Sequence, residues 1–151
     1  MTKRILAFIL CGIMLLFLAS CGQGKEDYTA KLVSIMNSKE ETSVQDVFSF
    51  EFDRAYVFNF EDGYLNGDGF AQKYNLDISI SQVEAGKTDN VQRIVFVDEA
   101  GNFVSLFQCT MDEIFIENKG VVIDPETVIN RSSSQEKPLQ ITFESADRYG
   151  S

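Results

Sequence analysis

From Val91 to Phe143 the chain presents one extended segment after another, and few helices fit between them. The segments "VQRIVFVD" and "NFVSLFQCT" flank Glu99–Gly101, whose glycine suits a hairpin turn. Strands that follow one another through short turns favour antiparallel pairing. Further strands are expected in "LDISIS", where Leu76, Ile78 and Ile80 alternate with polar residues, and in "EIFIE", "GVVI" and "LQITFE".

Two helices are expected before these strands. Tyr28, Leu32, Ile35 and Met36 recur at helical spacing, which predicts an amphipathic helix packed on a sheet. The segment Ser43–Asp46 has the pattern of a helix cap. The Ser43 hydroxyl would accept a hydrogen bond from the first turn of a short helix, and the Asp46 carboxylate would accept one from the Ser43 amide. The expected fold class is α+β: an antiparallel sheet of about five strands with one or two helices packed on one face. Residues 130–138, "NRSSSQEKP", are expected to form a flexible loop.

Every second residue from Phe48 to Phe60 is aromatic, except Arg54. A continuous strand would bury this guanidinium among phenylalanines, which is costly for an unpaired charge. A bend or bulge is therefore expected near Asp53 and Arg54, with the strand proper starting at about Ala55. Asp53 is the expected local partner of Arg54.

The amino-terminal segment has the pattern of a secretory signal. Lys3 and Arg4 precede Ile5–Ala19, an uncharged and mostly apolar run of 15 residues. Such a run is short for a membrane span, whereas a positive start followed by this length of apolar chain is typical of an export signal.

The run ends in Leu18-Ala19-Ser20-Cys21-Gly22, which resembles the lipobox of bacterial lipoproteins. The resemblance implies cleavage between Ser20 and Cys21 and attachment of a diacylglyceryl group to the Cys21 thiol. Each buried methylene contributes about 0.8 kcal/mol, so two chains anchor a protein durably. The expected organisation is a signal peptide over 1–20, a lipidated tether over 21–27 and one domain over 28–151, held at the extracytoplasmic side of the cell membrane.

A second resemblance concerns the body of the chain. The segments "FEFDRAYVF" and "IVFVDEAGNFV", with the short helix after the first, resemble a group of small uncharacterised bacterial lipoproteins over roughly residues 43–110. That group often has a tryptophan before the aspartate, where this chain has Phe52. The resemblance implies no catalytic residue.

The chain is strongly acidic, with a net charge of −10. Removal of residues 1–20 leaves 11 basic residues against 23 acidic ones, a net charge of −12. This charge repels phosphate backbones and anionic headgroups, which disfavours nucleic acid as a partner and a polybasic membrane clamp.

Of the three cysteines, Cys11 lies in the signal and Cys21 in the lipobox, so Cys109 is left alone in the mature chain. The chain has no histidine to activate a thiol. Strand periodicity places Cys109 on one face with Phe103 and Phe107, which predicts a buried small hydrophobe.

The segment "EDGYLNGDGF" holds Asp62, Asn66 and Asp68, which invite comparison with calcium loops. Counted from Asp62, an EF-hand would have Lys73 at its twelfth position, where an oxygen ligand is required. A turn followed by a short helix explains the same residues, so no metal or other cofactor is expected.

Two acidic pairs, Asp98-Glu99 and Asp112-Glu113, are expected in turns or at a solvated edge, because neighbours on a strand face opposite ways. The leading hypothesis is a non-catalytic binding or interaction module of the cell envelope, with an envelope protein or peptide as partner. The alternative, a carboxylate-dependent envelope hydrolase, requires a cleft with two convergent acids of raised pKa. The aromatic residues are expected to fill the core, although a groove for a lipid or peptide stays open.

Overall fold

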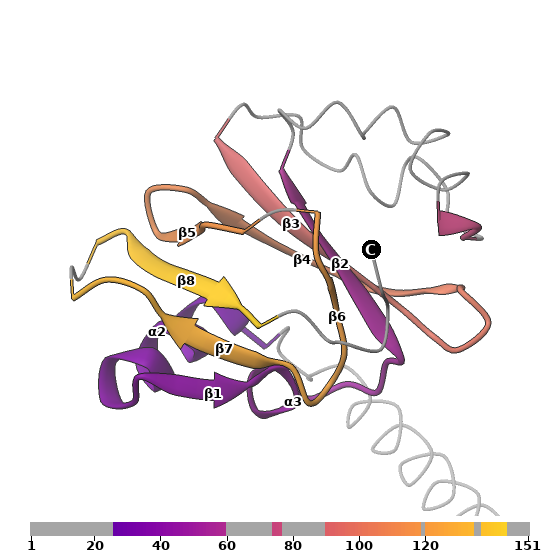
Figure 1. Cartoon of the computed structure of the whole chain (residues 1–151), viewed down its shortest axis with the longest axis horizontal. Helices are drawn as coiled ribbons and strands as arrows, with labels where there is room; N and C mark the ends of the chain where they lie inside the picture. The colour runs from indigo at the N-terminus through magenta and orange to yellow at the C-terminus, as the bar shows by residue number, and fades with distance from the viewer. Residues whose placement is uncertain (1–25, 60–73, 77–89, 119, 135–136, 145–151) are drawn as a thin grey trace, which may run out of the picture.

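The computed structural model describes residues 26–59, 74–76, 90–118, 120–134 and 137–144, which form two helices and two four-stranded sheets (Figure 1). The α+β class is confirmed, but the expectation of a single sheet of about five strands is wrong. Asp62, Asn66, Asp68, Ser20, Cys21 and the "LDISIS" strand beyond Leu76 lie outside the described residues. In chain order the elements are α2 (Tyr28–Ser38), β1 (Glu41–Ser43), α3 (Val44–Val47), β2 (Arg54–Asn59), β3 (Val91–Val97), β4 (Phe103–Thr110), β5 (Ile114–Ile116), β6 (Val122–Ile123), β7 (Val128–Arg131) and β8 (Leu139–Phe143).

One sheet has the order β4-β3-β2-β6 and is antiparallel throughout. The other has the order β1-β7-β8-β5, and its β5–β8 pair is parallel. Antiparallel pairing is therefore the wrong expectation for this pair. A parallel pair needs a crossover longer than a hairpin, and the chain between β5 and β8 supplies it by passing through β6 and β7.

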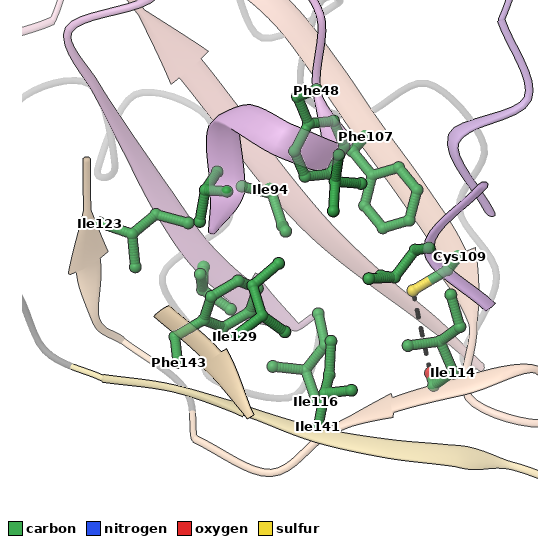
Figure 2. Packing of buried hydrophobic residues seen from close by; sticks show 14 of the residues in the cluster. Phe48, Ile94, Phe107, Cys109, Ile114, Ile116, Ile123, Ile129, Ile141 and Phe143 are labelled. Carbon is green, nitrogen blue, oxygen red and sulfur yellow. Dashed lines mark hydrogen bonds between the residues drawn. The ribbon is translucent and has the colours of Figure 1, made fainter. Parts of the chain in front are cut away.

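The main core lies between the two sheets. Ile94 of β3 meets Ile116 of β5 and Ile141 of β8 in one buried cluster (Figure 2). Phe96 of β3 belongs to the same cluster. The helix α2 adds Leu32 to this cluster. Because each sheet buries its apolar face against the other, the eight strands form two layers rather than one broad sheet.

Two of the strands that make up the second layer were not expected from the sequence. β1 has only three residues, and β7 runs into the polar tract for which the sequence predicts a loop. The expectation of a flexible loop over 130–138 is wrong at its start, because Asn130 pairs with Glu41 of β1 and with Thr142 of β8. Pairing on both sides outweighs the polar composition of this strand.

The strand β3 is buried on both faces along its whole length. Its second face carries Val95 and Val97, which pack with Tyr56 and Leu76 in a smaller cluster. A strand in the middle of a sheet that is covered on both sides has no polar face. The segment "VQRIVFVD" therefore shows little alternation.

A bulge in β4 changes which of its side chains face the main core. Phe96 pairs with Ser105 but Val97 pairs with Phe103, so Val104 is the extra residue. Val104 packs against the main core, and Phe103 packs against the smaller cluster on the opposite face. The expectation that Phe103 shares a face with Phe107 and Cys109 is thus wrong, because the bulge shifts the period of two.

The expected helix over α2 is confirmed. Asp27 begins it as the N-cap, and its Oδ1 accepts a hydrogen bond from the Ala30 amide at 3.0 Å. Leu32 and Met36 are buried, whereas Tyr28 and Ile35 are half-buried beside the main core.

The short helix α3 is confirmed, but its expected side-chain cap is wrong. Ser43 makes no capping hydrogen bond through its side chain. The Val44 and Gln45 amides instead donate to the carbonyls of Thr127 and Pro125, each at 3.0 Å. Backbone carbonyls from a distant turn therefore satisfy the first amides of the helix.

The expected bend near Asp53 and the pairing of Asp53 with Arg54 are confirmed. The chain bends at Asp53, and Arg54 Nη1 lies 2.7 Å from Asp53 Oδ2. Its Nε donates to the Tyr56 hydroxyl at 3.0 Å. The strand β2 starts at Arg54 itself, one residue before the expected start.

Candidate functional site

The segment Phe48–Phe52 leaves α3, bends at Phe50 and leads to β2. Its three phenylalanines all pack against one ring of β3, that of Phe96. The ring centroids of Phe48, Phe50 and Phe52 lie 4.8, 4.9 and 4.8 Å from that of Phe96. The alternation seen in the sequence thus serves packing on one ring of β3 rather than pairing in a sheet.

Burial decreases along this segment. Phe48 is 1% exposed, whereas Phe50 and Phe52 are half-buried at the surface. Phe50 also meets the ring of Tyr28 edge-on at 5.7 Å. The segment therefore presents aromatic surface that is fixed in place yet accessible.

Two open grooves flank the segment. The first, here called the α2–β4 groove, measures about 600 Å³ and is lined by Glu26–Thr29, Phe50 and Ser105–Gln108. The second, here called the Pro125 groove, measures about 460 Å³ and is lined by Gln45, Phe48–Phe52 and Pro125. Phe50 contributes to both grooves, so they lie on either side of one aromatic side chain.

Among the described residues, the charged groups that line these grooves are acidic: Glu26, Asp27 and Glu51. Glu26 Oε2 accepts a hydrogen bond from Ser49 Oγ at 2.5 Å, and its Oε1 lies 2.9 Å from Lys31 Nζ. These contacts, the Ser49 hydrogen bond foremost, lower the pKa of Glu26. The carboxylate therefore stays ionised beside the α2–β4 groove at neutral pH.

Cys109 is buried as expected, at 3% exposure. Burial raises the pKa of its thiol to about 12, and the negative charge of Glu113 adds to the effect. The sulfur lies 3.8 Å from the Ile114 carbonyl oxygen, which accepts its weak hydrogen bond (Figure 2). A thiol that stays protonated in an apolar core is a packing residue and not a nucleophile.

The expectation that the acidic pairs lie in turns is confirmed. Asp98 begins the β3–β4 hairpin, where Oδ1 accepts from the Asn102 amide and Oδ2 from its side chain, each at 2.8 Å. These bonds lower the pKa of Asp98. After β4, Asp112 accepts from Asn90 Nδ2 at 2.8 Å and Glu113 from Thr110 Oγ1 at 3.0 Å.

A hydrolase that works with two carboxyls needs one whose pKa is raised. The carboxyls of Glu26 and Asp98 are shifted in the opposite direction. Within the part of the chain that the structure describes, no three side chains of the metal-ligating types gather at one place.

The sequence leaves an aromatic groove open but locates neither of these two grooves, because their walls come from distant parts of the chain. The alternation of Phe48, Phe50 and Phe52 is the available signal, but by itself it does not distinguish a groove wall from core packing. Comparisons with protein-family models, with curated proteins and with solved structures found no match to this chain. Among the helices in the described ranges, none is long and apolar enough to cross a membrane.

Proposed function

We propose that this chain is a lipoprotein anchored through Cys21 on the extracytoplasmic side of the cell membrane, whose folded domain is a non-catalytic binding module for an envelope protein or peptide. The observation that carries the anchor is the sequence Leu18-Ala19-Ser20-Cys21 at the end of an apolar run of 15 residues. The grooves support the binding role.

The two grooves have the character of recognition surfaces. Each combines aromatic side chains with polar groups, and both kinds of contact occur at surfaces that bind peptides. Packing on Phe96 holds Phe50 and Phe52 in position before a ligand arrives. A rigid aromatic surface loses little conformational entropy on binding.

The anchor is tested by the intact mass of the protein extracted from membranes. Loss of residues 1–20 together with added acyl mass supports it. A Cys21→Ala form should leave the membrane fraction or retain its leader. If native material carries an unmodified Cys21 thiol, the anchor is ruled out.

The binding role is tested by photo-crosslinking in intact envelopes. A crosslinking amino acid replaces Thr29, which lines the α2–β4 groove, or Glu51, which lines the Pro125 groove. Ser134, exposed beyond β7, serves as the control position. A discrete adduct at a groove position and none at Ser134 supports the module. Equal labelling at all three positions contradicts it.

A further inference from the structure

The strand β4 stands at the edge of its sheet. It pairs with β3, and no strand in the described ranges pairs with its other side. The other edge strands are short: β1 and β5 have three residues each and β6 has two, whereas β4 has eight. In the described part of the molecule, β4 therefore offers the longest open row of backbone N–H and C=O groups.

The sequence of β4 lacks the usual protection of such an edge. Proteins protect open edges with charged side chains, prolines or bulges, because an unprotected edge pairs with other chains. Phe103–Thr110 contains no charged residue and no proline, and its bulge at Val104 affects only its start. From Ser105 onward β4 is a regular template for a further strand.

The α2–β4 groove follows this edge. Four consecutive residues of β4, Ser105–Gln108, line it. Because successive side chains of a strand point to opposite faces, a groove that touches four in a row runs beside the backbone and not over one face. The first turn of α2 forms the other wall and Phe50 lies between the two walls. This space suits an extended chain.

Charge indicates which chain fits. Glu26 and Asp27 line the groove, and no lysine or arginine does among the residues that the structure describes. Lys31 pairs with Glu26 and offsets part of its charge, but the chain as a whole carries a net charge of −10. Two copies of this chain would repel each other, which disfavours pairing of β4 with β4 of a second copy. A basic partner is attracted by the same charge.

We propose that an extended, basic segment of a partner protein adds to β4 as a further strand in the α2–β4 groove. Main-chain hydrogen bonds to β4 provide the affinity, and apolar side chains at alternate positions rest on Tyr28 and Phe50, which lie on the main-core side of the sheet. Glu26 and Asp27 select lysine or arginine at the intervening positions. This inference rests on the proposed function, since it names the partner class and the site of the binding module.

The test uses the full chain purified from membranes in detergent and a fluorescent peptide that alternates lysine and valine. Two control peptides replace lysine with glutamate or place proline at the centre. We expect only the first peptide to raise the fluorescence anisotropy, and to slow hydrogen exchange of the β4 amides. Equal binding of the glutamate peptide overturns the charge argument and the proposal with it. Equal binding of the proline peptide overturns strand addition.

Matched variants locate the site. Gln108→Lys places a positive charge at the exposed edge, and Ser134→Lys makes the same change in charge at an exposed position that does not line the groove. We expect Gln108→Lys to weaken peptide binding by about tenfold and Ser134→Lys to change it by less than about twofold. Equal weakening, or a dimer that pairs through β4, overturns the proposal. Two results together would separate the two proposals: the peptide does not bind, and the Gln108→Lys variant still forms the crosslink to its envelope partner. The proposed binding function would then be retained, and the β4 site would be ruled out.

Discussion

Gln92 and Ile116 join the two sheets through a pair of hydrogen bonds. Gln92 Nε2 of β3 donates to the Ile116 carbonyl of β5 at 2.8 Å, and the Ile116 amide donates to Gln92 Oε1 at 2.7 Å. The side-chain amide thus takes the place of a neighbouring strand for Ile116. Since Gln92 is only 1% exposed, no solvent could replace these bonds.

Replacing Gln92 by leucine keeps the buried volume but removes both partners of Ile116. Each buried group left without a hydrogen bond costs about 1–3 kcal/mol. We therefore expect Gln92→Leu to lower the free energy of unfolding by about 2–4 kcal/mol. Urea denaturation of a soluble form that starts at Gly22 measures this loss. The matched variant Gln108→Leu, at an exposed position of β4, should stay within about 0.5 kcal/mol. Equal losses would show that the sheets do not depend on Gln92.

Gly101 in the β3–β4 hairpin has a φ of +87°. A Cβ at this position would lie 3.5 Å from the Asn75 oxygen and from Leu76 Cδ2, which are ordinary contacts. The cost of Gly101→Ala is therefore one of backbone conformation, about 1–2 kcal/mol. Thermal unfolding should show a smaller loss for Gly101→Asn, because asparagine tolerates this region. An alanine variant as stable as the parent would contradict the positive φ of Gly101 in this turn.

The buried Cys109 thiol makes the free energy of unfolding depend on pH in the alkaline range. The ordinary pKa of a cysteine thiol is 9.0, and burial raises the pKa of Cys109 in the folded chain to about 12. The raised folded pKa favours the protonated thiol, so its full contribution to stability is present below pH 9 and is lost as pH rises from 9 toward 12.

In that window the unfolded chain releases a proton that the folded chain keeps, which lowers the free energy of unfolding by about 1.4 kcal/mol per pH unit. Urea titrations at pH 7 and at alkaline pH should show this slope in the parent soluble form and its absence in Cys109→Ala. Groups that titrate in both forms cancel in the comparison. The same slope in both forms would contradict a buried thiol.

The anchor predicts how the domain is oriented. Six residues separate Cys21 from Tyr28, so the start of α2 lies within roughly 25 Å of the proposed anchor residue. Arg131 donates to the carbonyls of Met36 and Ser134, which places Ser134 at the other end of α2. A fluorophore on Ala30→Cys should therefore be quenched more strongly by spin-labelled lipid than one on Ser134→Cys. Equal quenching would contradict this orientation.

The sequence by itself determined the local structure. The spacing of Leu32 and Met36 defines one side of α2, the cost of burying Arg54 predicts its pairing with Asp53, and Gly101 marks the hairpin. These features depend on residues close together in the chain, whose period and chemistry can be read directly.

Only the tertiary structure decided how these pieces cover one another. A period of two shows that a strand has an apolar face, but it does not say which distant strand packs against that face. The bulge at Val104, the carbonyl of Thr127 that caps α3 and the bonds between Gln92 and Ile116 all follow from such contacts. The α2–β4 groove belongs with them, because its walls are separated by some 80 residues and meet only when the helix packs beside the sheet edge.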